Sequence, residues 1–455
     1  MCYGNRGYDI LGFIARMKFY NREKELETLR KIQRLSCSES QMTVVTGRRR
    51  VGKTQLLLKA CEGQVTLYFF VSRKSETLLC RDFTEEVREK LKMPVGEFNS
   101  FGKLFEALLL LSENVCFNLI VDEFQEFLRI NPSVYGDMQK YWDLHHKRGK
   151  MNLLVSGSVN SLMHKIFENS KEPLFGRAGC IIRLKAFGVK TLKEILADHN
   201  PSYSNDDLLA LFSITGGVAW YVELLMKYGC FCVRQMLDAV FDENSLFLQE
   251  GKNVLVEEFG KEYAVYFSIL ECVARGLCTR GEIESYLGNV ETGGYLARLE
   301  KDYDILKVRQ PLFSKPNSKQ VRYYIGDNFL CFWFRFVYKY QRYIESGSLP
   351  LLREIAGRDY PVFSGLMLER YFHLLFSERQ CYTAIGGFWD RSGENEIDLI
   401  AVNEMEKRMS ICEVKRQSDN ISLPILTEKS KAFLAKNAQL KGYETSFVAL
   451  SLDDM

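Results

Sequence analysis

Residues 43–54 read TVVTGRRRVGKT and have the spacing of a phosphate-binding loop. The β-branched run before Gly47 predicts a strand, and the residues after Lys53 predict a helix, which is the context that the motif requires. Glycine lets the backbone curl so that several N–H groups point at phosphate oxygens. The following helix would present its positive N-terminal end to the same anion. The alternative is a chance match in a glycine turn.

The positions of this loop have separate predicted roles. Lys53 is expected to reach the β- and γ-phosphates of a nucleotide, and Thr54 to place its hydroxyl on Mg²⁺. We find no NKxD-type motif that would read guanine, so the predicted cofactors are ATP and Mg²⁺. The residues expected to bind the nucleotide here are Gly47, Arg48, Arg49, Arg50, Val51, Gly52, Lys53, Thr54 and Gln55.

A second motif, FNLIVDE at residues 117–123, supports the first. It is a buried-strand pattern that ends in two carboxylates. Asp122 is suited to hold the Mg²⁺ through a bound water, and Glu123 to orient or deprotonate the attacking water. Such a glutamate is typical of ATPases that activate water with an acidic residue, more than of small GTPases.

Two further sites are candidates for contact with the γ-phosphate. Ser156 and Ser158 follow a predicted strand at 152–155, at the carboxyl end of the sheet where ligands bind in open α/β folds, and one of the two serines could sense the γ-phosphate. The alternative is that Ser156 and its neighbours only form a turn. Arg177, in PLFGR, either stabilises phosphoryl charge within the chain or across a subunit contact, or is a surface cation.

Helix and strand signals alternate up to about residue 190, which predicts an α/β fold with a mostly parallel sheet and helices on both faces. Residues 1–16 show no clear periodicity and receive no role. The predicted domains are a P-loop ATPase domain at 17–190, a helical lid at 191–258, a winged helix at 259–327, an aromatic connecting helix at 328–359 and a nuclease-like domain at 360–455.

The predicted winged helix contains a capping box, Thr279 with Glu282, and a hairpin at 305–325. Its basic residues could contact phosphates, but neighbouring acidic residues reduce the local positive charge. The element therefore either contacts nucleic acid or acts as an interdomain spacer. The basic residues concerned are Arg298, Lys301, Lys315, Lys319 and Arg322.

The last hundred residues show the order helix, three strands, helix, strand, with the first helix expected at 362–377, and this order is the core topology of the restriction-endonuclease-like fold. Asp398 begins the middle strand, while Glu413 and Lys415 share one face of the next. Two converging carboxylates favour a Mg²⁺ site, and Lys415 would orient or deprotonate the nucleophile. Glu369 is a possible extra metal ligand. The alternative is a degenerate nuclease fold that only binds or scaffolds, since a surface ladder of ion pairs would give the same pattern of acidic and basic residues.

Composition sets further limits. The net charge of +3 is too small to indicate nucleic-acid binding by itself. Thirteen scattered cysteines without paired CxxC spacing predict reduced thiols in the cytoplasm and no zinc site. No secretory signal is visible, and the most apolar segment, residues 328–343, is too short and too charged to span a bilayer. No membrane association is therefore expected.

Taken together, FYNREKELETL at residues 19–29, GRRRVGKT, LIVDEFQ, LLVSGS, PLFGR, GGVAWYV and EIDLIAV with CEVK resemble the archaeal-type ATPase family of STAND and AAA-like P-loop proteins. Members often carry a C-terminal nuclease-like domain of the PD-(D/E)XK type. The resemblance implies the ATP and Mg²⁺ roles given above, and that Arg22 lies in a segment opening a helix beside the adenine pocket. Many relatives have proline where Ala219 stands here.

These patterns predict an ATP-binding and hydrolysing switch in which nucleotide occupancy changes how the lid and winged helix sit on the P-loop domain. In the first hypothesis the C-terminal domain cleaves DNA or RNA through Asp398, Glu413 and Lys415. In the second the chain is a nucleotide-gated signalling protein with a silent C-terminal domain and a protein partner. A homo-oligomer is compatible with both.

Overall fold

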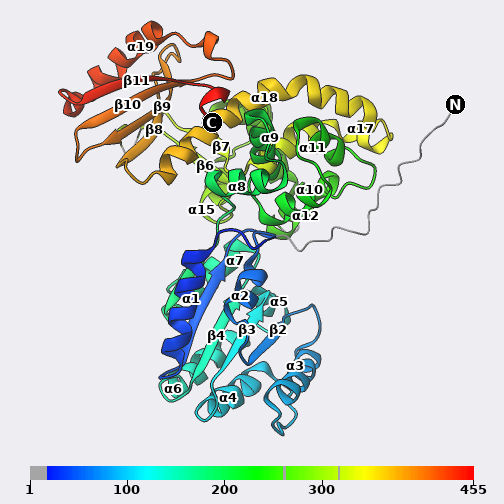
Figure 1. Ribbon diagram of the computed structural model, residues 1–455. Coiled ribbons are helices and arrows are strands. Elements are labelled where there is room, and N and C mark those ends of the chain that lie inside the picture. Colours follow the sequence, from blue (N-terminus) through cyan, green and yellow to red (C-terminus); the bar gives the residue numbers. More distant parts are fainter. Residues whose placement is uncertain (1–17, 260–262, 316–317) are drawn as a thin grey trace, which may run out of the picture.

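The computed structural model describes residues 18–259, 263–315 and 318–455. It has an α/β lobe, a mostly helical middle lobe and a C-terminal lobe built on a second sheet (Figure 1). Residues 1–16 and the turn at 316–317 that the sequence placed in the winged helix lie outside the described residues.

The α/β lobe contains a parallel sheet with the strand order β2-β3-β4-β1-β5. Strands β3 and β4 are buried along their whole length because helices cover both faces of the sheet. This confirms the predicted α/β fold. The strands are β1 (Gln41–Thr46), β2 (Thr66–Phe70), β3 (Phe117–Asp122), β4 (Met151–Ser156) and β5 (Cys180–Arg183).

The helices of this lobe pack on opposite faces of the sheet through two separate hydrophobic clusters. One cluster joins α1 (Glu23–Ser36) and α2 (Lys53–Ala60) to the sheet. The other joins helices that include α3 (Glu76–Leu91), α4 (Phe101–Ser112), α6 (Ser133–His145) and α7 (Asn160–Glu168). The short turns η1 (Phe124–Glu126) and α5 (Phe127–Ile130) follow β3. The phosphate-binding loop leaves the carboxyl end of β1, facing the middle lobe (Figure 1).

The middle lobe begins with α8 (Val189–His199), α9 (Asn205–Thr215), α10 (Ala219–Lys227), α11 (Val233–Val240) and α12 (Phe247–Phe259). Gly216 and Gly217 join α9 to α10 with φ angles of 58° and 71°. A Cβ on Gly217 would lie 2.3 Å from the Phe187 carbonyl oxygen, so the close backbone approach requires glycine. Ala219 is the first residue of α10, a position that also accepts proline.

The predicted helices and hairpin of residues 259–327 are present as α13 (Tyr263–Ala274), α14 (Arg280–Tyr286), α15 (Gly293–Lys301), β6 (Leu306–Arg309) and β7 (Arg322–Ile325). The Thr279 hydroxyl accepts the backbone N–H of Glu282, and the Glu282 carboxylate accepts the N–H of Thr279, which confirms the capping box. The Leu312 N–H donates to the Gly387 carbonyl at 2.8 Å, joining this unit to the C-terminal sheet.

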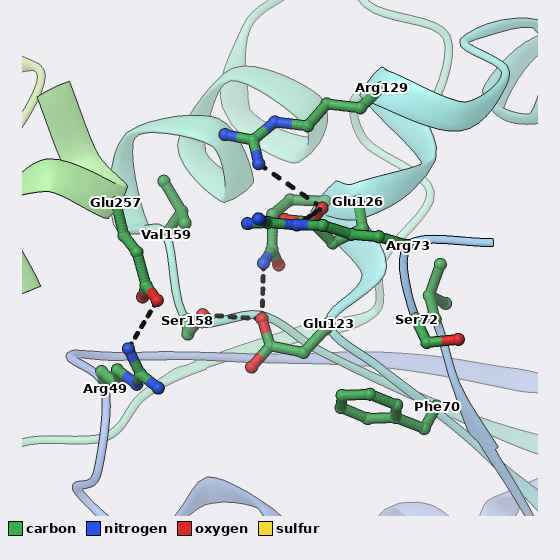
Figure 2. Close-up of a pocket in the computed structure, with 12 residues that line it drawn as sticks. Arg49, Phe70, Ser72, Arg73, Glu123, Glu126, Arg129, Ser158, Val159 and Glu257 are labelled. Carbon is green, nitrogen blue, oxygen red and sulfur yellow. Dashed lines mark hydrogen bonds and ion pairs between the residues drawn. The ribbon is translucent and has the colours of Figure 1, made fainter. Parts of the chain in front are cut away.

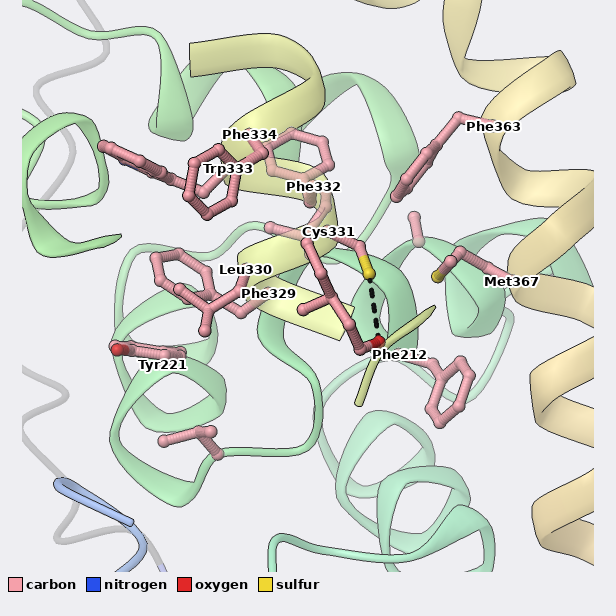
Figure 3. Packing of buried hydrophobic residues seen from close by; sticks show 14 of the residues in the cluster. Phe212, Tyr221, Phe329, Leu330, Cys331, Phe332, Trp333, Phe334, Phe363 and Met367 are labelled. Carbon is pink, nitrogen blue, oxygen red and sulfur yellow. Dashed lines mark hydrogen bonds between the residues drawn. The ribbon is translucent and has the colours of Figure 1, made fainter. Parts of the chain in front are cut away.

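The aromatic segment after β7 is not one regular helix. It divides into α16 (Asn328–Phe332), the π-helical turn η3 (Trp333–Val337), η4 (Tyr338–Tyr340) and α17 (Gln341–Glu345). Its large side chains fill the core of the middle lobe (Figure 3). The helix that was predicted to begin at residue 362 begins earlier, as α18 (Leu349–Glu378), and runs through Pro361. The predicted boundary between residues 359 and 360 therefore falls inside a continuous helix.

The C-terminal sheet has the order β11-β10-β9-β8, with β11 parallel to β10 and the other pairs antiparallel. Leu399 and Val414 join the cluster that contains α18, whereas Ile400 and Ile411 face α19. Its elements are β8 (Ala384–Trp389), β9 (Glu396–Asn403), β10 (Arg408–Val414), η5 (Ser418–Asn420), α19 (Leu423–Lys436), η6 (Ala438–Leu440), β11 (Glu444–Leu450) and η7 (Leu452–Asp454).

Within the described parts of the chain, no helix combines the length and apolar character needed to cross a bilayer.

We expect Gly217→Ala to lower the melting temperature more than Gly63→Ala. Both residues have a positive φ, of 71° and 78°, so alanine at either site costs about 1–2 kcal/mol of backbone strain. Only Gly217 lacks room for a methyl group, because nothing lies within 4 Å of the Cβ position at Gly63. Thermal unfolding of the two variants would measure the difference, and equal shifts would contradict the tight packing at Gly217.

Candidate nucleotide site and C-terminal carboxylate site

The loop at residues 47–54 has the backbone that a phosphate cradle needs. Gly47 has a φ of 145°, and a Cβ there would meet the Leu184 carbonyl oxygen at 2.4 Å. Lys53 follows Gly52 as the first residue of α2, and its ammonium donates to the carbonyls of Gly47 at 2.8 Å and Arg48 at 3.1 Å. Burial lowers the pKa of Lys53 to about 8, against the opposing effect of Glu123 and Asp122.

Asp122, at the end of β3, accepts hydrogen bonds from three hydroxyl groups beside the phosphate-binding loop. The Thr54 hydroxyl donates to its Oδ2 at 2.7 Å, and the Ser156 hydroxyl donates to its Oδ1 at 2.5 Å. The Tyr68 hydroxyl also donates to Oδ2, at 2.8 Å. Hydroxyl and carboxylate oxygens next to a phosphate cradle are the donors that Mg²⁺ prefers, so these residues fit the predicted ion.

Glu123 lies beside Asp122 with a left-handed φ of 55°, which turns its side chain toward an open pocket (Figure 2). Two donors hold its Oε2, the Ser158 hydroxyl at 2.6 Å and the Gln125 amide at 2.5 Å. The pocket has a volume of about 250 Å³. Its wall also carries Arg73 and Arg129, which both pair with Glu126. Glu123 is therefore a positioned carboxylate facing a space that can admit water.

The three consecutive arginines of the loop are all paired with carboxylates of the middle lobe. Arg48 forms an ion pair with Asp327 and lies over the Phe329 ring at 5.5 Å.

The other two arginines reach α12. Arg49 Nη1 lies 2.5 Å from Glu257 Oε1, and Arg50 Nε lies 3.1 Å from Glu250 Oε1. The Trp220 N–H donates to the Arg50 carbonyl at 3.2 Å. The loop therefore contacts α10, α12 and the residue before α16.

Two more residues flank the loop. Arg22 is 5% exposed, and its Nη2 donates to the carbonyls of Lys185 at 2.7 Å and Val51 at 3.4 Å. Arg22 thus supports the loop, and its predicted contact with the nucleotide stays a prediction. The Glu258 carboxylate accepts the Asn160 N–H at the start of α7. Burial raises the pKa of Glu258 to about 7.

The structure corrects two sequence-based assignments. Ser156 is fully buried and gives its hydroxyl to Asp122, so it positions Asp122, whereas Ser158 is the serine beside Glu123. Arg177 pairs with Asp143 at 2.7 Å and precedes β5, which is parallel to β1, so Arg177 lies at the amino edge of the sheet, opposite the loop at the carboxyl edge. It cannot act on phosphate within its own chain, and an action across a subunit contact stays a prediction.

In the C-terminal sheet, the predicted residues Asp398, Glu413 and Lys415 converge. Lys415 Nζ lies 3.2 Å from Asp398 Oδ2 and 3.3 Å from Glu413 Oε1. Lys429 of α19 adds a contact of 3.5 Å to Glu413 Oε1. The second carboxylate oxygen of Glu413 is buried and has no hydrogen-bond partner among the described residues.

Glu369 of α18 also faces this region. Burial and the charge of Asp398 raise the pKa of Glu369 to about 8. One turn later, His373 Nε2 lies 2.9 Å from the Asp398 carbonyl oxygen, and burial lowers its pKa to about 4. The described residues contain no group of three or more His, Cys, Asp or Glu arranged to hold a metal ion. The role of Glu369 as an extra metal ligand stays a prediction.

Models of two known protein families match parts of the chain, and the first of these parts contains the α/β lobe. Residues 19–225 match the family described as an ATPase domain predominantly from Archaea. The chain carries an archaeal-type ATPase domain. Residues 333–431 match a family of archaeal and bacterial proteins of unknown function.

Two relatives extend over most of the chain. An uncharacterized protein of Methanocaldococcus jannaschii, MJECL04, is 28% identical over 406 residues, which are 87% of each chain. The structure of the Walker-type ATPase paby2304 of Pyrococcus abyssi is similar, with a TM-score of 0.52 and 18% identity, and covers 70% of this chain and 97% of its own. At that identity the likeness concerns the fold.

Sequence reasoning missed the carboxylates that pair with the loop. Glu250, Glu257 and Asp327 lie some 200 residues or more from their arginine partners, and no local pattern marks them. Tyr68 and Gln125 were also missed. Gln125 could have been found, because it stands two residues after Glu123 in VDEFQ.

We expect Glu258→Gln to raise the melting temperature above pH 7 and to change it little near pH 4.5. The folded-state pKa of Glu258, about 7, exceeds its ordinary value of 4.5. Between pH 4.5 and about 7 the Glu258 carboxyl keeps its proton in the folded state and loses it in the unfolded state, so the free energy of unfolding falls as pH rises. Above pH 7 the carboxylate is charged in both states, and the full cost of burying that charge is present. Thermal unfolding across pH would measure this, with the exposed Glu243→Gln as control. The same shift at both pH values would contradict the assignment.

Proposed function

We propose that this chain binds ATP with Mg²⁺ at residues 47–54 and hydrolyses it with Glu123 as the residue that orients or deprotonates water. The observation that carries the proposal is the joint placement of Thr54 on Asp122 and of Glu123 between Ser158 and Gln125. ATP supplies the phosphoanhydride bond, and Mg²⁺ neutralises charge that develops on its phosphates. The Lys53 ammonium donates to two loop carbonyls, and a change of its side-chain rotamer would let it donate to phosphate oxygens instead.

The protein groups have distinct tasks in this proposal. Ser156 and Tyr68 fix the rotamer of Asp122, so that its carboxylate stays beside Thr54. Ser158 and Gln125 both hold the same oxygen of Glu123 and leave the other free for a water molecule. Such positioning supplies much of the rate in phosphoryl transfer, since the enzyme forms no covalent bond to the phosphate.

We expect Lys53→Ala to abolish ATP retention, because it removes the cation meant for the phosphates. Glu123→Gln should retain ATP and slow its hydrolysis by about 10²–10⁴-fold, the usual contribution of a general base. Equilibrium binding and single-turnover hydrolysis would measure the two effects. Lys59→Ala is the matched control, since Lys59 lies on the same helix and pairs with Glu62, away from the loop. Equal ATP binding by Lys53→Ala and wild type would contradict the proposal.

A second proposed activity is metal-dependent cleavage of DNA or RNA at the C-terminal sheet. The buried unpartnered oxygen of Glu413, next to Asp398, supports a divalent ion at this place, since such an oxygen otherwise costs free energy. Lys415 lies within 3.3 Å of both carboxylates and could orient a nucleophile or steady developing charge.

The alternative is a silent C-terminal domain that binds a protein partner. It is favoured by the pairing of Glu413 with two ammonium groups, those of Lys415 and Lys429, which neutralise the carboxylate without a metal. In this case nucleotide occupancy would regulate binding only, and the chain would act as a signalling protein.

Plasmid and single-stranded substrates with Mg²⁺ or Mn²⁺ separate the two possibilities. If the domain is a nuclease, we expect cutting by wild type that is lost in Lys415→Ala, because the variant loses the ammonium next to both carboxylates. Lys431→Ala serves as the control, because Lys431 lies on α19 and pairs with Glu428, away from the site. No cutting with ATP, with ADP or without nucleotide would favour the silent domain.

A further inference from the structure

Residues 325–328 contact both the nucleotide loop and α18, the helix that carries Glu369. Asp327 stands two residues after the end of β7 and caps α16, where its Oδ1 accepts the Leu330 N–H at 2.9 Å. The same carboxylate pairs with Arg48 of the loop, and their side chains are each 20% exposed. The start of α16 therefore contacts the phosphate-binding loop through this ion pair and through the Phe329 ring under Arg48.

The residues on either side of Asp327 hold α18. Arg370 Nη1 donates to the Ile325 carbonyl at 2.8 Å and to Asn328 Oδ1 at 3.1 Å. Arg370 is only 9% exposed, and its guanidinium lies over the Tyr324 ring at 5.2 Å. A segment of four residues, 325–328, thus binds the loop through Asp327 and α18 through its two ends.

Arg370 immediately follows Glu369, which faces Asp398. His373, on the next turn of α18, lies 2.9 Å from the Asp398 carbonyl oxygen. A rotation or shift of α18 at Arg370 must therefore move both side chains relative to β9.

The segment has little freedom to absorb such a movement. A Cβ on Gly216 would lie 3.2 Å from the Phe329 N and 3.6 Å from the Asn328 N, so the turn between α9 and α10 packs closely against the start of α16. Phe329, Leu330 and Phe332 are buried beside it in the aromatic core, which Phe363 and Met367 of α18 also enter (Figure 3). Close-packed elements shift as units and do not deform locally.

We infer that Asp327 and Arg370 are positioning residues that couple nucleotide occupancy of the loop to the placement of Glu369 and His373 at the C-terminal carboxylate site. The inference rests on the proposed ATP binding, and it does not depend on whether the C-terminal site cuts nucleic acid. Phosphate binding draws Lys53 away from the carbonyls of Gly47 and Arg48, and Arg48 transmits the change to Asp327. By linkage, a ligand at the C-terminal site then changes ATP affinity by the same factor.

Asp327→Asn is the decisive variant. Asparagine can still cap α16, but it loses the charge that pairs with Arg48. Hydrogen exchange of peptides from residues 363–376 would be followed in full-length protein, without and with a nonhydrolysable ATP analogue and Mg²⁺. We expect the analogue to change exchange in wild type, and we expect Asp327→Asn to lose this change while calorimetry shows that it still binds the analogue.

Three further variants make the test specific. Asp304→Asn removes an exposed carboxylate that pairs with Lys307 in the same lobe, and should behave as wild type. Asp327→Glu keeps the charge and should restore part of the response. Arg370→Gln cuts the connection at its other end and should lose the response as Asp327→Asn does, which keeps the inference testable if Asp327→Asn does not fold.

The outcomes are distinct. Absence of analogue binding by wild type would overturn the proposed function and the inference with it. Binding by wild type with unchanged exchange in residues 363–376 would overturn the inference alone. An undiminished change in folded Asp327→Asn or Arg370→Gln that binds the analogue would also overturn it.

Discussion

The pairing of three adjacent cations of the phosphate-binding loop with carboxylates of the middle lobe determines how the two lobes sit together. Arg48, Arg49 and Arg50 reach Asp327, Glu257 and Glu250 respectively. Glu250 is 2% exposed, and a carboxylate buried to that extent is stable only beside a cation that meets it in a fixed geometry. The loop that is expected to bind the nucleotide is therefore also a polar contact between the two lobes.

Local sequence patterns predicted most of what depends on neighbouring residues. The parallel sheet, the helix that begins at Lys53 and the capping box of Thr279 follow from alternation, glycine spacing and side-chain chemistry within a few positions. The convergence of Asp398, Glu413 and Lys415 could also be predicted, because strand periodicity places alternate residues on one face. The carboxylate partners of the arginines could not, since nothing near Glu250 or Asp327 in sequence indicates a partner so far along the chain.

Two expectations failed for different reasons, the first of which concerns the position of a motif in the sheet. PLFGR precedes β5, and the segment before a parallel strand lies at the amino edge, so Arg177 could not reach a loop at the carboxyl edge. The second concerns the helix expected at 362–377, which left out the residues before Pro361. In the structure α18 continues through it, and burial of Tyr360 and Phe363 on either side outweighs the lost backbone hydrogen bond.

The length of α18 has a consequence for the ancestry of this architecture. Its first half packs with the aromatic residues of the middle lobe, while Leu399 and Val414 of the C-terminal sheet belong to the same continuous core. A recombination event that replaced the sheet alone would expose that shared apolar surface. A crossover just before Leu349 would instead separate the first half of α18 from the aromatic residues that it packs against, so exchange of the C-terminal lobe between genes would expose apolar surface on either side of this helix.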